Sequence, residues 1–548
     1  MIHPIPSGTR DVLPDEMREL RAITETLRSV FERHGYGEVY TPAIEYESVM
    51  AQAPGSNVSP AYRVFDDHGE ILALRADMTV PIARLVATRY PTGDPPLRFC
   101  YIAHAYRAVR PHRGQMREFL QAGIELVGAP GAGGTAEALT VLCGALDAVG
   151  LGGYRVGLGD ASLYPKLMAA CDVPDEARRR LLHELGTKDL VGLEHEVHEL
   201  GLADEAAELL VRVPQLRGGP DVLAGSGTLV ADALAGLRDV LDLLAPAVAE
   251  RVIFDLGLAR GLGYYSGAVF DVYDPALGAP LGGGVRRLRP RARGAARRRR
   301  AVRRPPRALR PRPPGRRLRD RRRPASRRAV RRGACRAVNR FGLTIAVPRG
   351  ALLRETLDLL DLLGVDTAEV RANDRKLLFD DAGIVTMRPS DVPTYVEAGA
   401  ADIGITGKDV LMEQSERSVF ELLDLGFGAC TMVLASVDEE PDPAAEALRR
   451  LGVVRVATKY PRIAAGFFER TGRQAEIVEV KGSVELAPLT GLVEAIVDLT
   501  ATGTTLRENR LVVREEIAVA TARLIANPVA HKLKAEAIDA VLGRLRER

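Results

Sequence analysis

Residues 285–338 constrain this chain most, because they cannot belong to a packed core. They contain 25 arginines, one acidic residue (Asp320), no lysine, and no Ile, Phe or Tyr. A segment so charged and so poor in large apolar side chains cannot bury enough surface to offset the entropy of ordering it. We therefore predict a disordered joint here, between one folded domain at 1–284 and another at 339–548.

The arginine run is typical of a nucleic-acid-binding arm, but the rest of the chain carries the opposite charge. The formal net charge of the protein is +4, and it becomes −20 when the 25 arginines and Asp320 are left out. An affinity for polyanions therefore belongs to this segment or to no part of the chain. We do not expect a nucleic-acid partner for the folded domains.

The cysteines and the apolar runs indicate the compartment. The five cysteines are scattered and form no CxxC pair, which favours a reducing environment over a disulfide framework or a structural zinc site. The N-terminus has proline and acidic residues before any apolar run, unlike a signal peptide. No stretch approaches the ~20 apolar residues of a membrane span. We expect a cytoplasmic protein without a membrane partner.

The first domain has two clear secondary-structure signals. Residues 15–34 place apolar side chains at helical spacing between Pro14 and Gly35 and predict an amphipathic helix. From Pro96 to Gly128, apolar and polar residues alternate around a basic turn, which predicts an antiparallel hairpin with one buried face.

Four stretches resemble the catalytic core of histidyl-tRNA synthetase over roughly the first 283 residues. They are GTRDVLP at Gly8, LRADMT at Leu74, the hairpin, and ARGLGYYSGAVFDVY from Ala259. The resemblance implies an α+β class II synthetase-like fold on an antiparallel sheet. It also implies a histidine pocket, in which carboxylates and an amide meet the amino group and the imidazole while tyrosines pack on the ring. The implied pocket residues are Asp77, Thr79, Gln121, Glu125, Arg260, Tyr264 and Tyr265.

Several departures from the synthetase pattern argue against aminoacylation. Val109 and Gln115 stand where the synthetase has a glutamate and a phosphate-gripping arginine. The glycines ending at Gly284 lead into Val285 instead of an Arg-Tyr-Asp sequence, and no anticodon-binding domain follows. This domain therefore resembles the regulatory subunit of ATP phosphoribosyltransferase, a synthetase relative that has lost aminoacylation. The resemblance implies that histidine binds here as a feedback inhibitor.

The missing continuation suggests an explanation of the arginine run. If Val285 to Leu288 are encoded GTA-CGA-CGA-CTN, a shift by one base gives TAC-GAC-GAC, which encodes Tyr-Asp-Asp. Arginine without lysine is what an out-of-frame reading of GC-rich DNA yields. We hypothesise that 285–338 is a frame-shifted tail of the regulatory domain, with a genuine basic linker as the alternative. The nucleotide sequence decides between them.

Strands and helices alternate in the second domain. Apolar strands are expected at 343–347 and near Ala401, Thr431, Arg455, Glu476 and Glu494, with a helix at 352–363. This alternation predicts a parallel α/β fold.

The stretch from Glu494 to Arg507 carries the sharpest chemical signal. A buried strand ends at Asp498, and a loop of threonines and glycine leads to a helix start; ligands bind at such strand ends in open α/β sheets. Free backbone N–H groups and hydroxyls suit a phosphate, and the acid suits ribose hydroxyls. The loop residues are Thr500, Thr502, Gly503, Thr504 and Thr505.

Further motifs resemble the short-form catalytic subunit of ATP phosphoribosyltransferase from Phe341 to the end of the chain. They include VPRG at Val347, NDRKLLF at Asn373, and the long stretches that begin at Arg388 and Lys481. The resemblance implies a two-lobed α/β fold similar to periplasmic binding proteins, with the substrate between the lobes and two crossings of the chain.

The implied reaction is the first step of histidine biosynthesis. N1 of the adenine of ATP attacks phosphoribosyl pyrophosphate, giving phosphoribosyl-ATP and pyrophosphate, with Mg²⁺ carried mainly by the substrates. Asp498 would hold the ribose, the threonine loop the 5′-phosphate, and Arg375 would face the leaving pyrophosphate. Weaker candidates for phosphate contacts are Arg349, Arg388, Lys408 and Lys459. The family commonly has arginine where this chain has Ala351, which puts fast turnover in doubt.

The two resemblances together predict a fused regulatory and catalytic enzyme that forms a hetero- or homo-oligomer of such parts. One alternative is an RNA-binding or aminoacylating protein that uses the synthetase-like domain and the arginine run. Another is a solute-binding module, because this fold alone does not imply catalysis.

Overall fold

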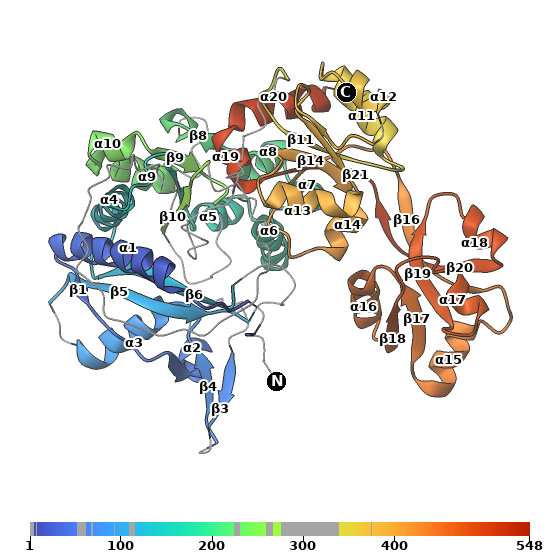
Figure 1. The fold of residues 1–548 in the computed structure, drawn as a ribbon, viewed down its shortest axis with the longest axis horizontal. Helices are drawn as coiled ribbons and strands as arrows, with labels where there is room; N and C mark the ends of the chain where they lie inside the picture. Colours follow the sequence, from blue (N-terminus) through green and yellow to red (C-terminus); the bar gives the residue numbers. More distant parts are fainter. Residues whose placement is uncertain are drawn as a thin grey trace, which may run out of the picture.

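The computed structural model of the protein describes residues 5–547 except 7, 52–61, 67–68, 92–93, 109–115, 224–230, 259–266, 276–338 and 374. Two halves are described, an N-terminal half (5–275) and a C-terminal half (339–547), which lie side by side in Figure 1. The predicted joint, its predicted disorder and the domain boundaries at 284 and 339 involve residues outside the described part, so these stay predictions.

The first part of the N-terminal half contains both predicted signals. Helix α1 (Pro14–Arg33) has its apolar face against the sheet, where Val30 and Phe31 are buried with Cys100. The hairpin is β5 (Leu97–Tyr106) and β6 (Glu118–Val127), paired antiparallel as predicted. The other elements here are β1 (Gly37–Glu38), β2 (Ile44–Tyr46), α2 (Glu47–Ala51), β3 (Arg63–Phe65), β4 (Ile71–Leu74), α3 (Thr79–Arg89) and α4 (Ala132–Ala148).

The second part of this half is a sheet of order β10-β7-β9-β8 with helices packed on it. Its strands are β7 (Arg155–Asp160), β8 (Arg217–Gly218), β9 (Val252–Asp255) and β10 (Ala268–Tyr273). Its helices are α5 (Leu163–Ala170), α6 (Asp175–Thr187), α7 (Leu190–Glu199), α8 (Asp204–Arg212), α9 (Ala231–Leu243) and α10 (Pro246–Ala249).

The C-terminal half has two lobes, each built on its own sheet. The first lobe has the strand order β12-β13-β11-β14-β21-β15. Its strands are β11 (Ile345–Pro348), β12 (Leu378–Phe379), β13 (Ile384–Met387), β14 (Ile403–Gly407), β15 (Phe420–Asp424) and β21 (Ala522–Ala526). Its helices are α11 (Leu353–Leu362), α12 (Ala368–Ala372), α13 (Val392–Glu397), α14 (Lys408–Glu413), α19 (Pro528–Leu533) and α20 (Ala535–Arg546).

The second lobe has the strand order β18-β17-β19-β16-β20 and lies on the right of Figure 1. Its strands are β16 (Cys430–Val437), β17 (Val454–Thr458), β18 (Ala475–Glu479), β19 (Ala495–Thr500) and β20 (Leu511–Ala520). Its helices are α15 (Pro443–Leu451), α16 (Pro461–Arg470), α17 (Leu486–Leu489) and α18 (Thr504–Glu508).

The chain crosses between the lobes twice, as predicted, but the sheets are mixed and not purely parallel. The crossings are residues 425–429, between β15 and β16, and Thr521, between β20 and β21; we call these two segments the hinge. Strand β21 pairs antiparallel with β14 and β15, and β16 pairs antiparallel with β19 and β20. A strand that arrives directly from the other lobe needs no returning helix, so it can join its sheet antiparallel. The prediction of parallel sheets was wrong at these strands.

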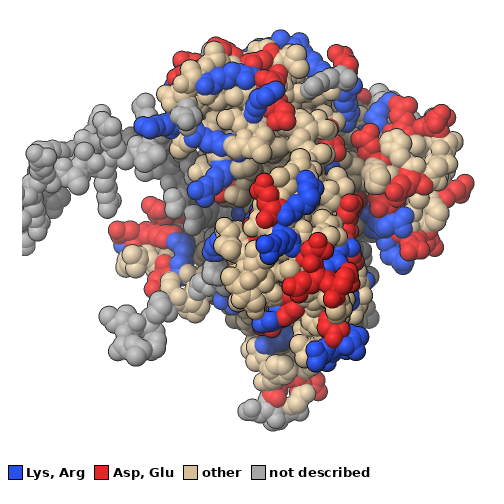
Figure 2. All heavy atoms as spheres, turned by 90° about the vertical axis from the view of Figure 1, so that its right-hand side faces the viewer, with Lys and Arg blue, Asp and Glu red and all other residues tan. Residues whose placement is uncertain are grey.

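No helix in the described part of the chain is long and apolar enough to cross a membrane. On the face shown in Figure 2, acidic and basic side chains of the described residues are interspersed and form no broad basic surface.

Candidate functional site

Two predicted site residues meet at the strand ends of the second lobe. Strands β17 and β19 run parallel, with Thr458 opposite Val497. Their carboxyl ends therefore deliver Lys459 and Asp498 to the same edge, where Lys459 Nζ lies 3.0 Å from Asp498 Oδ1. Asp498 is buried, whereas the Lys459 side chain is 41% exposed. A fixed carboxylate beside a reachable cation suits a ligand that carries both hydroxyl and phosphate groups.

The threonine-rich loop follows directly and is closed by its own side chains. Gly503 has a φ of +70°, a left-handed conformation that glycine adopts without strain, and its N–H donates to Thr500 Oγ1 at 2.9 Å. The hydroxyls of Thr502 and Thr504 lie 3.0 Å apart in exposed positions. The turn ends as α18 begins at Thr504, and Thr505 is exposed in its first turn. The loop presents hydroxyls and backbone N–H groups beside Asp498.

Three further predicted cations lie at the strand ends of the first lobe. Strand β11 pairs parallel with β13 and with β14. The residues that follow these strands are Arg349, Arg388 and Lys408, so all three leave the carboxyl edge of one sheet. Ligands of open α/β sheets bind at this edge. Arg388 is exposed at this edge, whereas Arg349 and Lys408 are hydrogen-bonded to other parts of the protein.

Arg349 is engaged within the lobe, and it supports the loop that carries Arg375. Its Nε donates to Thr386 Oγ1 at 3.0 Å, and its Nη2 donates to the Lys376 carbonyl at 2.6 Å. Arg375 is exposed on that loop, and Ala351 is exposed in the turn after β11. Arg349 therefore holds this loop in place, and the exposed Arg375 stays a predicted ligand contact.

The predicted histidine pocket is partly described. Asp77 and Thr79 lie at the start of α3, and Gln121 and Glu125 lie on one face of β6. Thr79 Oγ1 donates to Glu125 Oε1 at 2.8 Å, and Gln121 Nε2 donates to Tyr101 Oη at 3.0 Å. Thr79 and Glu125 are therefore in contact with Asp77 nearby, and Gln121 lies further along the same face of β6.

Burial raises the pKa of both carboxyl groups of this cluster. It raises the pKa of Glu125 to about 7. The negative charge of Asp77 also raises this pKa, whereas the hydrogen bond from Thr79 lowers it. Burial also raises the pKa of Asp77. A pair of partly buried carboxyls with raised pKa values is suited to receive a cationic group. The remaining predicted residues, Arg260, Tyr264 and Tyr265, lie outside the described residues, as do Val109 and Gln115.

Lys408 is held where the two halves of the chain meet. Its Nζ donates to Glu421 Oε2 and to Asp189 Oδ2, both at 2.7 Å. Asp189 belongs to the N-terminal half and caps α7 by accepting from the Gly192 N–H at 2.8 Å. Although burial alone lowers it, the pKa of Lys408 is raised, because Glu421 and Asp189 stabilise the ammonium. Sequence reasoning did not select Asp189 or Glu421 as site residues, because they are ordinary acids until the halves dock.

Helix α14 also connects the two lobes. Tyr460 Oη lies 3.2 Å from Asp409 Oδ2, and Glu413 Oε2 accepts from the N–H groups of Arg462 and Ile463 at 3.1 Å. These contacts fix the start of α16, next to Lys459, against the first lobe. Sequence reasoning missed them because they join residues about fifty positions apart.

Two family models match the chain. A model described as histidyl-tRNA synthetase matches residues 8–287, and a model described as ATP phosphoribosyltransferase matches residues 388–547.

The similar proteins also match one half of the chain each. The chain is 54% identical to an ATP phosphoribosyltransferase of Rubrobacter xylanophilus over 204 residues, which cover 37% of this chain and 94% of the relative. It is 43% identical to an ATP phosphoribosyltransferase regulatory subunit of Symbiobacterium thermophilum over 289 residues, 52% of this chain and 72% of the relative. Among solved structures, it is similar to the ATP phosphoribosyltransferase (HisG:HisZ) complex of Thermotoga maritima, with 36% identity, 37% of this chain and 96% of that chain covered, and a TM-score of 0.32.

Proposed function

The chain belongs to the ATP phosphoribosyltransferase family, with a catalytic region in its C-terminal half and a histidyl-tRNA synthetase-like regulatory region in its N-terminal half, and we propose that the two regions work as one histidine-regulated enzyme. The enzyme is a glycosyltransferase of histidine biosynthesis. The observation that supports the proposed site best is the meeting of Lys459 and Asp498 beside the threonine loop.

In the proposed mechanism, the second lobe holds phosphoribosyl pyrophosphate. The Asp498 carboxylate accepts hydrogen bonds from the ribose hydroxyls, and the hydroxyls and N–H groups of residues 500–505 donate to the 5′-phosphate. Lys459 neutralises charge between them. The exposed Arg375 of the first lobe faces the pyrophosphate as the bond to the ribose C1 breaks.

Adenine N1 carries a free lone pair, so its attack on C1 requires no strong general base. The contribution of the protein is then to position two polyanions and to stabilise the charge on the leaving pyrophosphate. This is chemistry that fixed cations and hydrogen-bond donors from two lobes can supply.

The donor set fits Mg²⁺ that arrives with the substrates. Within the described ranges, no three acidic, histidine or cysteine side chains cluster as a protein metal site requires. Asp498, the carboxylate at the strand ends, is already paired with Lys459. Phosphate oxygens and water would supply most ligands, with Asp498 within reach, and bound Mg²⁺ would neutralise pyrophosphate charge.

Histidine is proposed to bind the cluster of Asp77, Thr79, Gln121 and Glu125. The carboxylates would receive its ammonium group, and the amide and hydroxyl would fix its orientation. The raised pKa of Glu125 supports this role, because a carboxyl that is partly withdrawn from water gains from a cationic ligand. A regulatory region in the same chain gives this site a route to the catalytic half.

The experiment is to incubate the full-length chain with ATP, phosphoribosyl pyrophosphate and Mg²⁺ and to identify the products by chromatography and mass spectrometry. The proposal expects phosphoribosyl-ATP and pyrophosphate in equal amounts, and none when phosphoribosyl pyrophosphate is omitted. Charging of tRNA with histidine is measured in parallel. Charging without phosphoribosyl-ATP formation would support the aminoacylating alternative instead.

A further inference from the structure

The N-terminal half covers an edge of the catalytic sheet. Strand β15 is the last strand of the first lobe's sheet. The Glu421 N–H donates to the Lys188 carbonyl at 3.0 Å, and Asp189 pairs with Glu421 in a parallel bridge. Lys188 Nζ also donates to Ser418 Oγ at 2.9 Å. The turn before α7 thus pairs with the edge strand through a single β-bridge, which fixes the position of Asp189 against the catalytic half.

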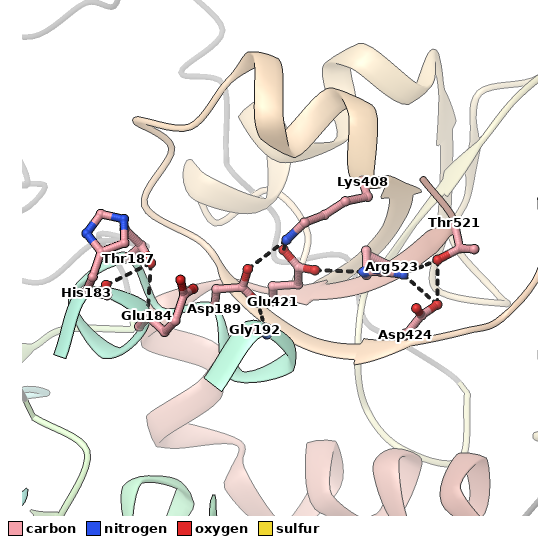
Figure 3. A network of polar contacts seen from close by, with 10 residues as sticks. All are labelled: His183, Glu184, Thr187, Asp189, Gly192, Lys408, Glu421, Asp424, Thr521 and Arg523. Atoms are coloured by element: carbon pink, nitrogen blue, oxygen red, sulfur yellow. Dashed lines mark hydrogen bonds and ion pairs between the residues drawn. The ribbon is translucent and has the colours of Figure 1, made fainter. Parts of the chain in front are cut away.

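From Asp189, charged side chains run without interruption to the hinge (Figure 3). Lys408 bridges Asp189 and Glu421, and the other oxygen of Glu421 accepts from Arg523 Nε at 2.7 Å. The Arg523 guanidinium reaches Asp424 Oδ1 at 2.5 Å. Every link is an ion pair or a charge-assisted hydrogen bond, the stronger kind of polar contact.

The far end of this network holds both crossings between the lobes. Asp424 is the last residue before one crossing, and Thr521 forms the other; Thr521 Oγ1 donates to Asp424 Oδ1 at 2.7 Å. Arg523 also donates to the Thr521 hydroxyl. The backbone N–H of Lys408 donates to the Thr521 carbonyl at 3.0 Å. Lys408 therefore contacts the hinge by its backbone and the N-terminal half by its side chain.

The middle of the network is buried, whereas Asp424 at its hinge end is 41% exposed. The side chains of Glu421 and Arg523 are 7% and 10% exposed, and those of Asp189 and Lys408 are 18% and 22% exposed. Little water is available to replace a lost partner, so neighbouring groups must shift when one charge is removed. Lys408 is also the first residue of α14, and Glu413 of this helix accepts a hydrogen bond from the start of α16 in the second lobe.

We propose that Asp189 is a positioning residue for catalysis, which sets the interlobe hinge through Lys408, Glu421 and Arg523 and so transmits the state of the N-terminal half to the catalytic lobes. It touches no substrate and acts only through the hinge. The inference rests on the proposed function only in that the hinge serves catalysis. The contact itself is independent of which ligands the lobes bind.

The decisive variant is Asp189→Asn in the full-length chain. Asparagine is a good helix N-cap, so its side-chain oxygen can still accept from Gly192 while the negative charge facing Lys408 is lost. The matched control is Glu199→Gln on the same helix; Glu199 is 59% exposed and contacts His195. Lys408→Met removes the same link from the catalytic side.

Amide hydrogen exchange measures how well the hinge is held, and it does not depend on enzyme activity. The amides of Leu425 and Ala522 donate across the two crossings, to Ala522 O and Phe427 O at 2.9 Å. We expect these amides to exchange about tenfold faster in Asp189→Asn than in Glu199→Gln. The exchange rates of amides in β5 and β6 should be the same in both variants. Equal exchange of the hinge amides in the two variants would overturn the proposal.

Turnover gives the second readout. Asp189→Asn is expected to lower kcat by about threefold to tenfold, with an unfolding temperature like that of Glu199→Gln. Adding Asp189→Asn to Lys408→Met should lower kcat no further, because the link is already broken. Additive losses, or a loss of kcat that follows the unfolding temperature, would contradict a positioning role. A wild-type chain that forms no phosphoribosyl-ATP would refute the proposed function and leave the exchange test intact.

Discussion

The buried ion pair between Lys532 and Asp255 gives a quantitative test of how the two halves hold together. Lys532 Nζ in α19 lies 2.8 Å from Asp255 Oδ1 at the end of β9, and their side chains are 5% and 1% exposed. The second oxygen, Asp255 Oδ2, has no hydrogen-bond partner among the described residues. Burial lowers the pKa of Lys532, and Asp255 opposes that shift. The pair thus joins the halves, and each charge depends on the other.

Lys532→Met leaves the Asp255 carboxylate buried without its cation. Removing one member of a buried pair costs about 3–5 kcal/mol. A cavity of about 70 Å³, lined by Asp255, Lys188 and Asp271, lies beside the pair; it has room for water that can partly solvate the carboxylate, which favours the lower end. For a unit of this size, ~3 kcal/mol corresponds to a fall of about 6–12 °C in the first melting transition. The loss is limited by the free energy of docking, because separation of the halves returns Asp255 to water.

The assay is differential scanning calorimetry of the full-length chain, with limited proteolysis to detect separated halves. The control is Lys534→Met, because Lys534 pairs with Asp402 inside the C-terminal half at 2.7 Å and is 42% exposed; its loss should cost about 0–1 kcal/mol. Adding Asp255→Asn to Lys532→Met should restore part of the lost stability. If Lys532→Met melts within one degree of Lys534→Met and resists protease equally, the reasoning about this junction is refuted.

Three further predictions concern the ligand sites. Asp498→Asn should lower kcat/KM for phosphoribosyl pyrophosphate by about tenfold or more, measured by initial rates, because the ribose loses a charged acceptor; an unchanged kcat/KM would remove Asp498 from the site. Ala351→Arg should raise kcat with both substrates saturating, and an unchanged kcat would count against a role for the missing cation. The Glu125 carboxyl, with a pKa raised to about 7, must be ionised to bind an ammonium group. The affinity for histidine, measured by calorimetry, should therefore rise from pH 6 to pH 8. This rise should be smaller in Glu125→Gln.

The sequence predicted those parts of the fold that depend on local pattern. The spacing in 15–34 and the alternation from Pro96 to Gly128 are properties of single elements, and α1 and the β5–β6 hairpin confirm them. Strand directions depend on where the chain enters a sheet. The pattern of a buried strand is the same in both directions, which is why the antiparallel pairing of β16 and β21 was missed.

In the candidate site, too, the sequence predicted individual residues but not the contacts between distant parts of the chain. Asp498 and Lys459 were selected from separate motifs, but their contact requires two parallel strands to end side by side. Neither Asp189 nor Glu421 was selected as a site residue. They are more than two hundred positions apart, and only the docking of the halves gives these two acids a shared cation.

Inhibition by histidine tests most directly the claim that the two halves form one regulated enzyme. The rate of phosphoribosyl-ATP formation by the full-length chain is measured against histidine concentration, for the wild type and for Glu125→Gln. We expect histidine to lower the wild-type rate, and Glu125→Gln to keep its uninhibited rate but to need about tenfold or more histidine for the same inhibition. An active wild-type chain whose rate does not respond to histidine would contradict this claim.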